Sequence, residues 1–308
     1  MRFIFAPIQN TGRPSRGSAG IFRFVFALGL ALALSSGPSI CAASIDDAAA
    51  AHPAPGADSI RLGIQGYTFR ESNIADALDQ TRAAGVGYFE AYFKHELGYG
   101  LPGKFDHHMS RETREKILAL AKAKGVRIVS YYVDYGETEA DWRQIFEFAR
   151  AMGMEQIATE PQPEFFDLVE QLSTEFGIRV AVHNHPSPSH YADPSVALAA
   201  VQDRGPSIGL CADTGHWARS GFDPVDCLRR AEGRILELHF KDIEKRGDVH
   251  AVDLPFGTGT SDALGQIREL QRQHFHGYLF IEYENSRASL REDVAACVKF
   301  CRDSLGQK

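Results

Sequence analysis

A chain of 308 residues with a formal net charge of −7 has room for one large domain or two small ones. Its content of 44% hydrophobic and 24% charged residues is ordinary for a globular protein. The acidic balance excludes nucleic acids and anionic membrane surfaces as expected partners, because phosphate binding requires a basic surface.

Residues 1–43 have the pattern of a secretory signal peptide. An apolar run over 24–34 is followed by small residues as far as Ala43, and four arginines precede it: Arg2, Arg13, Arg16 and Arg23. The run is shorter than the roughly 20 residues of a membrane span, which disfavours the alternative of an uncleaved anchor. We therefore expect cleavage near Ala43, export to the periplasm and no stable membrane anchor. Cleavage would leave 29 basic and 40 acidic residues, a formal charge of −11.

Residues 44–59 are interpreted as a disordered leader, because they are rich in alanine and contain two prolines.

From residue 60 onward, apolar runs alternate with segments of helical periodicity, which is the pattern of βαβ units around a parallel sheet. Eight runs are predicted as strands: 61–66, 87–92, 127–133, 156–160, 179–183, 208–212, 234–240 and 277–282. Eight segments are predicted as helices: 74–84, 111–124, 139–152, 164–176, 194–203, 224–232, 262–274 and 290–304.

Two features favour a single (β/α)8 TIM barrel over residues 60–304. Each joint from a helix to the next strand contains a glycine that fits the left-handed position at a helix end: Gly85, Gly125, Gly153, Gly177, Gly205, Gly233 and Gly277. The joints from strand to helix are long and varied, as on the functional face of a barrel. An open doubly wound sheet is the alternative, but no glycine-rich dinucleotide fingerprint follows any predicted strand.

Four predicted strands end in a carboxylate or an imidazole: Glu160, Asp213, His239 and Glu282. A charged side chain at the end of a buried strand requires a cation or strong hydrogen-bond donors nearby. Because the carboxyl ends of barrel strands meet at one face, these residues are predicted to form a divalent-metal site. Three carboxylates with one imidazole suit Mn²⁺ as the first candidate, with Mg²⁺, Co²⁺ or Zn²⁺ as alternatives.

A second group of side chains is predicted to line the same face and to contact substrate: Glu90, His183, His185, His216, Trp217, Lys241 and Glu284. Simpler roles stay open for three of them. His183 also fits a core histidine, and Trp217 also fits a packing residue. Glu284 also fits an ion-pair partner of Lys241.

The loop after the seventh predicted strand, 241–261, is long for a barrel and contains two glycines within 255–259. We expect it to cover the mouth of the barrel and to help exclude water. An ordered structural loop is the alternative.

Five strings of the sequence resemble the xylose-isomerase-like TIM-barrel superfamily, specifically its sugar phosphate isomerase/epimerase group: ATEP (158–161), HNH (183–185), CADTGHW (211–217), ELHFKD (237–242) and FIEYE (280–284). The resemblance extends over residues 60–303. It assigns a divalent metal to the four strand-end residues named above. It also implies that Glu160 and Glu282 form the catalytic acid/base pair and that His216 contacts the substrate.

Such a set of residues suits proton abstraction next to a carbonyl, because a metal and two facing carboxylates can stabilise and reprotonate an enediolate. The leading hypothesis is a metal-dependent isomerase or epimerase. We expect its substrate to be an unphosphorylated sugar or keto-sugar, since sugar phosphates are scarce outside the cell. Two alternatives stay open: a keto-glycoside lyase that cleaves a 3-keto-glucoside by β-elimination, and a non-catalytic exported sugar-binding barrel. A homo-oligomer is also compatible with the sequence.

Overall fold

The computed structural model describes residues 60–307. The predicted signal peptide and leader lie outside the described residues. Within the described part of the chain, no helix combines the length and the apolar character needed to cross a membrane.

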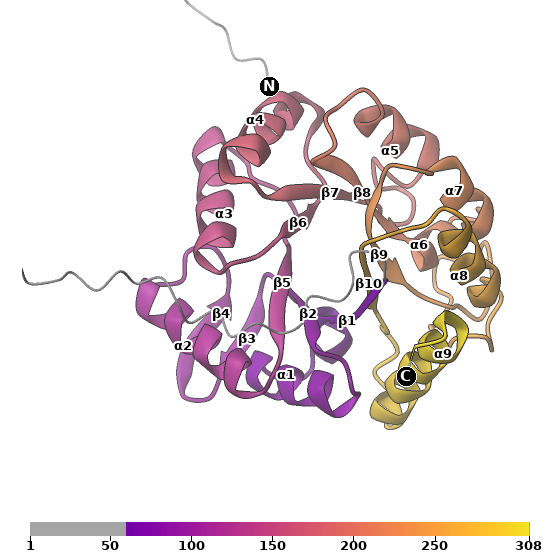
Figure 1. Ribbon diagram of the computed structural model, residues 1–308, viewed down its shortest axis with the longest axis horizontal. Coiled ribbons are helices and arrows are strands. Elements are labelled where there is room, and N and C mark those ends of the chain that lie inside the picture. The colour runs from indigo at the N-terminus through magenta and orange to yellow at the C-terminus, as the bar shows by residue number, and fades with distance from the viewer. Residues whose placement is uncertain (1–59, 308) are drawn as a thin grey trace, which may run out of the picture. The chain divides into compact units, whose positions relative to one another are not determined.

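Eight parallel strands close into a barrel, in which each strand is hydrogen-bonded to two neighbours (Figure 1). Around the barrel they follow the order β1-β10-β9-β8-β7-β6-β5-β2. Their bounds are β1 (Arg61–Gln65), β2 (Tyr88–Tyr92), β5 (Arg127–Tyr132), β6 (Gln156–Thr159), β7 (Arg179–His183), β8 (Ile208–Asp213), β9 (Ile235–Phe240) and β10 (Tyr278–Ile281). Every predicted strand is confirmed to within one residue at each end, and the closed barrel is confirmed with them.

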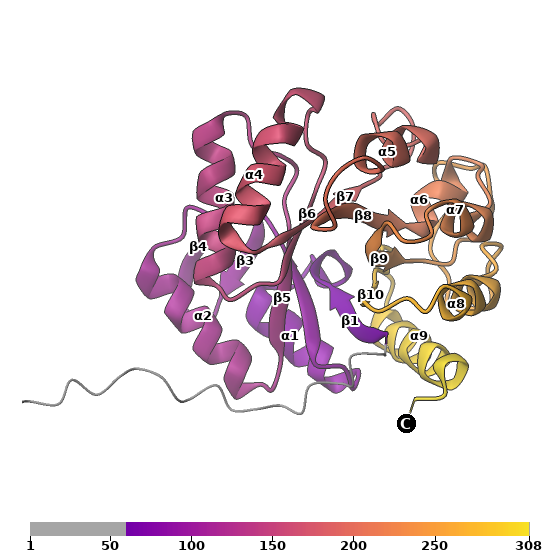
Figure 2. The ribbon, with the colours of Figure 1, turned by 45° about the horizontal axis from the view of Figure 1, so that its top comes forward.

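The helices surround the barrel and cover its outer face, as the two views of the ribbon show (Figures 1 and 2). The helices that return the chain to the next strand are α1 (Ile74–Ala83), α2 (Arg111–Ala123), α3 (Glu139–Ala151), α4 (Phe166–Phe176), α5 (Pro194–Val201), α7 (Pro224–Arg230) and α8 (Ala263–Arg272), and α9 (Leu290–Leu305) follows the last strand. A short helix that was not predicted, α6 (Thr214–Arg219), follows β8 directly. Two 3-10 turns, η1 (Gly66–Phe69) and η2 (Pro163–Phe165), follow β1 and β6.

Helix α3 shows how the local sequence produces these elements. Thr138 Oγ1 accepts a hydrogen bond of 3.2 Å from the backbone N–H of Asp141, and the Asp141 carboxylate accepts one of 3.0 Å from the backbone N–H of Thr138. This capping box satisfies two N–H groups that a helix start otherwise leaves unpaired. Trp142, Ile145 and Phe146 recur on one face and are buried. The helix therefore packs its apolar face inward.

The strand register brings the predicted site residues to one side of the barrel wall. Asp213 on β8 lies opposite His239 on β9, and His239 lies opposite Phe280 on β10. Glu282 follows Phe280 by two residues. Because side chains alternate between the two faces of a strand, Asp213, His239 and Glu282 all project into the barrel interior.

The segment 93–110, between the second predicted strand and the second predicted helix, contains a hairpin that the sequence pattern did not reveal. Strands β3 (His95–Gly98) and β4 (Leu101–Phe105) pair in antiparallel order. At its tip, Gly98, Tyr99 and Gly100 have φ values of 70°, 55° and 74°, in the left-handed region. Strands this short carry too few residues for an alternating apolar pattern to stand out.

Five of the seven glycines predicted to be left-handed have φ between 64° and 90°. The prediction is wrong for Gly205 and Gly277, which are not left-handed. After α8, His274 takes the left-handed conformation instead, with φ of 51°. Close packing explains the glycine at 277, because a Cβ there would lie 2.6 Å from the carbonyl oxygen of Leu236.

His95 ties the hairpin to the barrel from a fully buried position. Its side chain is 0% exposed, and its Nε2 lies 3.1 Å from the carbonyl oxygen of Ser72. The ring stacks on Tyr92 with 4.7 Å between centroids. Burial lowers the pKa of His95 to about 4. The folded protein therefore holds a neutral imidazole at a pH where an unfolded histidine is protonated.

We predict that His95 makes stability depend on pH between about 6.5 and 4. Its contribution is fully present above the unfolded pKa of about 6.5 and is lost as pH falls toward the folded pKa, by up to about 3 kcal/mol. Chemical denaturation at several pH values would measure this loss in the wild type. The variant His95→Gln should show a correspondingly shallower pH dependence. Identical slopes for the two proteins would contradict the prediction.

Candidate active site

A cavity of about 650 Å³ opens at the carboxyl ends of the barrel strands. Six of the predicted site residues line it: His183, His185, His216, His239, Glu282 and Glu284. Four aromatic side chains also line it: Tyr67, Tyr92, Phe93 and Tyr132. Imidazoles, carboxylates and flat aromatic surfaces therefore face one cavity.

Three further predicted residues, Glu90, Asp213 and Lys241, lie beneath the cavity surface and are 0% exposed. Trp217 differs from the prediction of a substrate contact. It is 1% exposed, it belongs to the main hydrophobic core and it does not line the cavity. Adjacent residues of a helix point about 100° apart, so α6 turns His216 toward the cavity and Trp217 into the core. Packing therefore accounts for Trp217.

Asp213, the last residue of β8, is the centre of the buried polar cluster. Its Oδ1 accepts a hydrogen bond of 2.7 Å from the backbone N–H of His216 and caps α6. Its Oδ2 lies 3.4 Å from Nε2 of both His183 and His216. Burial alone would raise the pKa of this carboxyl, but His216 and the Lys241 ammonium hold the pKa well below its usual range. Asp213 is therefore ionised in the barrel interior.

Lys241 supplies a positive charge to this cluster. Its Nζ donates hydrogen bonds of 2.8 Å to Asp213 Oδ2 and to Glu284 Oε1, and it lies 3.0 Å from Glu282 Oε2. Burial would lower the pKa of the amine, but the three carboxylates outweigh burial and raise the pKa well above its ordinary value. The structure thus places Glu284 in an ion pair with Lys241, the simpler of the two interpretations of Glu284.

His239 connects the cavity to a carboxylate deeper in the barrel. Its Nε2 lies 2.6 Å from Glu90 Oε1, while its Nδ1 lies 3.0 Å from Glu282 Oε2 and 3.9 Å from Asp213 Oδ2. Burial would lower the pKa of His239, but neighbouring Cys211, Glu90 and Glu282 raise it well above its ordinary value. These neighbours therefore favour positive charge on the His239 ring.

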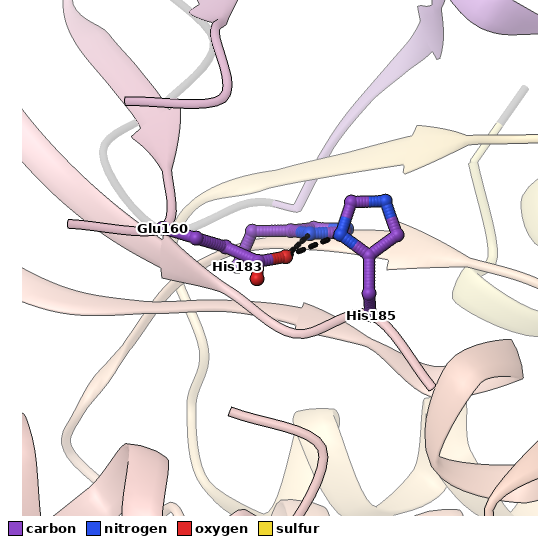
Figure 3. Close-up of side chains that lie close together, drawn as sticks. All are labelled: Glu160, His183 and His185. Carbon is purple, nitrogen blue, oxygen red and sulfur yellow. Dashed lines mark hydrogen bonds and ion pairs between the residues drawn. The ribbon is translucent and has the colours of Figure 1, made fainter. Parts of the chain in front are cut away.

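Glu160, predicted to meet the other strand-end residues, instead contacts two histidines (Figure 3). Its Oε1 lies 2.9 Å from His183 Nδ1 and also contacts His185 Nδ1, and its Oε2 accepts a hydrogen bond of 2.8 Å from Ser189 Oγ. Burial alone would raise the pKa of Glu160, but the hydrogen bonds from His183 and His185 lower it well below its usual range. Since the other nitrogen of His183 faces Asp213, the His183 ring stands between the two carboxylates.

The site also contains Arg219 and Asp253, which were not among the predicted site residues. Arg219 Nη2 donates a hydrogen bond of 2.5 Å to Asp253 Oδ1, and Nη1 lies 2.9 Å from Glu284 Oε2 and 3.1 Å from His216 Nδ1. Burial, and then the nearby Glu284, raises the pKa of Asp253 to about 7. A helical interpretation of 214–219 could have found Arg219, because it lies one turn after His216.

The loop 241–261 forms one wall of the cavity, through residues 249–253. Asp242 anchors it from a position that is 1% exposed. The carboxylate accepts hydrogen bonds of 2.9 Å from the backbone N–H groups of Gly257, Gly259 and Ser261. These bonds hold the loop in a defined arrangement, which favours the interpretation as an ordered structural loop.

The cluster fits a divalent cation. Ligand atoms of His183, Asp213 and His239 all lie within 4.8 Å of one another. His239 Nδ1 and Glu282 Oε2 are buried and face each other at 3.0 Å, and Lys241 Nζ lies 3.0 Å from the same oxygen. Buried carboxylates are costly unless positive charge lies beside them, and Lys241 already supplies one such charge. The cluster therefore combines the carboxylates and imidazoles from which divalent-metal sites are built.

The fold and the site define a (β/α)8 barrel protein with an acidic, imidazole-rich cavity at the carboxyl ends of its strands. The sequence signature of the xylose isomerase-like TIM barrel family matches residues 78–303, and the chain belongs to this family.

Among curated proteins, the chain is similar to a rhizopine catabolism protein from Rhizobium meliloti, with 35% identity over 136 residues that cover 38% of this chain and 40% of that protein. It is also similar to an inosose dehydratase from Lacticaseibacillus casei, with 25% identity over 195 residues that cover 50% of this chain and 65% of that enzyme. The chain thus spans less than two thirds of the length of these relatives.

Among solved structures, an uncharacterised protein from Parabacteroides distasonis is similar, with a TM-score of 0.66, 30% identity and coverage of 79% of this chain and 98% of that one. The IolI protein, solved with a bound zinc atom, has a TM-score of 0.61 at 14% identity and covers 80% of this chain and 98% of its own. At that identity the likeness concerns the fold alone.

We predict that Asp242→Ala loosens the cavity wall. The variant leaves three backbone N–H groups without their acceptor, which should lower the free energy of unfolding by about 3 kcal/mol and expose the loop. Limited proteolysis with mass spectrometry should then find faster cleavage within 243–261. Glu244→Ala, which removes an exposed carboxylate from the same loop, serves as the control and should match the wild type. Equal cleavage of all three proteins would contradict the anchoring role.

Proposed function

We propose that this protein is a divalent-metal-dependent sugar isomerase or epimerase that abstracts a proton next to a carbonyl. One observation carries the proposal: carboxylates and imidazoles with closely spaced, buried ligand atoms converge at the floor of a cavity large enough for a sugar. The similarity to an inosose dehydratase supports a sugar-like substrate. Isomerisation and epimerisation share the same first step, the removal of a proton beside the carbonyl.

Each residue has a role that follows from its position. A divalent ion, when bound, would polarise the substrate carbonyl and stabilise the negative charge left by deprotonation, with Mn²⁺ the first candidate and Mg²⁺, Co²⁺ or Zn²⁺ as alternatives. Glu282 lines the cavity and is assigned to proton transfer. Glu160 contacts His185, which lines the cavity, so this imidazole can pass a proton between Glu160 and the substrate.

The charges around the cavity support an unphosphorylated substrate. Lys241 and Arg219 are each paired with two or more carboxylates. Arg70 donates hydrogen bonds to backbone oxygens, and Lys94 pairs with Asp134 at 3.6 Å. A phosphate is usually held by cations that are free to bind it. Export to the periplasm, proposed from residues 1–43, agrees with this substrate class.

Deuterium exchange tests the proposal. A panel of ketoses and keto-sugars, incubated in D₂O with Mn²⁺, should incorporate deuterium at the carbon beside the carbonyl, as read by NMR. Chelator should abolish the exchange. Glu282→Gln should slow it by about 10²–10⁴-fold, because the variant loses a proton carrier.

Glu164→Gln makes the same change at an exposed carboxylate away from the cavity, so it is the control and should exchange at the wild-type rate. Sugar binding without exchange at any carbon would contradict the enzymatic proposal and favour a non-catalytic sugar-binding barrel.

A second cavity favours one alternative, a keto-glycoside lyase. This cavity, of about 520 Å³, adjoins the first, since both are lined by His185 and Pro186. Glu160 and Tyr135 also line it. A substrate with two parts, such as a 3-keto-glucoside and its aglycone, would fill both. Removal of the C2 proton beside the C3 ketone would form a C1–C2 double bond as the C1–O bond breaks, and the aglycone would leave with that oxygen and the bonding electron pair.

A 3-keto-glucoside with a chromogenic aglycone separates the two reactions. The lyase would release the aglycone, produce an unsaturated sugar and react more slowly when C2 carries deuterium. Proton exchange at C2 without release of the aglycone would exclude the lyase and leave the isomerase or epimerase. Release with no isotope effect and no unsaturated product would indicate hydrolysis and contradict both.

A further inference from the structure

The second cavity, of about 520 Å³, is formed by segments that follow β5, β6 and β7, at Tyr135, 160–162 and 185–191. Its volume lies within the range of about 300–1,000 Å³ that is common for small-molecule sites. Because His185 and Pro186 line both cavities, a ligand bound in the first cavity can extend into the second. The chemistry of the walls indicates what kind of group would bind there.

The second cavity offers few hydrogen-bond donors to a ligand. Three of its lining residues are prolines, which have no backbone N–H: Pro161, Pro186 and Pro188. Two of its hydroxyl groups are already used within the protein. Ser189 Oγ donates a hydrogen bond of 2.8 Å to Glu160 Oε2, and the Tyr191 hydroxyl donates to the backbone carbonyl of Pro161. The backbone N–H groups of Ser187 and Ser189 likewise donate to oxygen atoms of the protein.

This shortage of donors disfavours a second sugar in the cavity. A pyranose carries several hydroxyl groups, and each one that leaves water without a hydrogen-bond partner weakens binding. An anionic group is disfavoured as well. None of the described residues that line the cavity is a lysine or an arginine, and Glu160 carries a negative charge there. The walls therefore favour a neutral group that needs few hydrogen bonds.

Aromatic and proline rings supply flat surfaces for such a group. Tyr191 is 1% exposed, packs edge-on against Phe166 with 6.4 Å between centroids and is held by its hydrogen bond to Pro161. This anchored ring and the fixed backbone of the prolines form the wall before a ligand arrives. Tyr135 lines the same cavity but is 43% exposed. An aromatic ring bound beside Tyr135 would cover apolar surface that the fold leaves open to water.

We propose that the second cavity is a subsite for a neutral aromatic ring, and that the substrate is a keto-sugar with an aryl substituent. The inference rests on the proposed function for the sugar half of the substrate, which occupies the first cavity. The aryl half passes His185 and Pro186 to reach Tyr135. Such a substituent also suits the β-elimination described above. A phenol ionises with a pKa of about 10, as tyrosine does, and therefore leaves more readily than a sugar alcohol.

Calorimetry with the full chain and unoxidised glucosides tests the subsite without any turnover. Phenyl β-glucoside should bind about 10-fold more tightly than methyl β-glucoside, which lacks the ring. Tyr135→Ala should remove most of this preference and leave the affinity for methyl β-glucoside unchanged, whereas Tyr135→Phe should retain the preference. Tyr99→Ala is the matched control and should behave as the wild type, because Tyr99 is 77% exposed and lines neither cavity.

Cellobiose, which carries a second glucose in place of the aromatic ring, separates the two kinds of occupant. Tighter binding of cellobiose than of phenyl β-glucoside would overturn the proposal. Equal affinities for the phenyl and methyl glucosides, no binding of the phenyl glucoside, or a phenyl preference that survives in Tyr135→Ala would overturn it too, even if keto-sugars exchange deuterium. A phenyl preference that depends on Tyr135, without deuterium exchange of any keto-sugar, would preserve the subsite and refute the proposed function instead.

Discussion

The site depends on one buried carboxylate, that of Asp213 at the end of β8. Burying this charge without partners would destabilise the barrel, so the surrounding strands supply an ammonium group and several imidazoles around it. His239 lies on β9, Lys241 is the residue directly after β9, and His183 lies on β7. The interactions that stabilise the buried Asp213 carboxylate therefore also fix the relative positions of the carboxyl ends of β7, β8 and β9.

The buried cationic side chains at this face, Lys241 and Arg219, form ion pairs with carboxylates of the same chain. Lys241 and Arg219 share Glu284 between them, and Arg219 also holds Asp253 from the loop after β9. The cavity consequently presents imidazoles and carboxylates, together with the aromatic rings that line it. This surface is the basis for proposing an unphosphorylated substrate, because its available atoms are mainly hydrogen-bond acceptors.

The barrel was predictable because its signals are local. Apolar β-branched runs and helical periodicity recur at regular intervals, and each depends on neighbours only a few residues apart. Where the signal was weak, prediction failed: the hairpin around Tyr99 is too short to show a period, and no helix was predicted over 214–219, which form a short helix capped by Asp213. That missed helix explains why the sequence left the role of Trp217 open and did not assign Arg219 to the site.

The sequence by itself determined the closed barrel, the strand ends that carry charge and the participation of Asp213, His239 and Glu282 in one cluster, since parallel register alone aligns those positions. Only the tertiary structure decided the place of Glu160, which the sequence put with that cluster. A strand end locates a Cα, but the direction of a long side chain depends on which partners satisfy its charge. His183 at the end of β7, together with His185 and Ser189 in the loop after β7, satisfies the Glu160 carboxylate. These contacts turn the side chain of Glu160 away from Asp213.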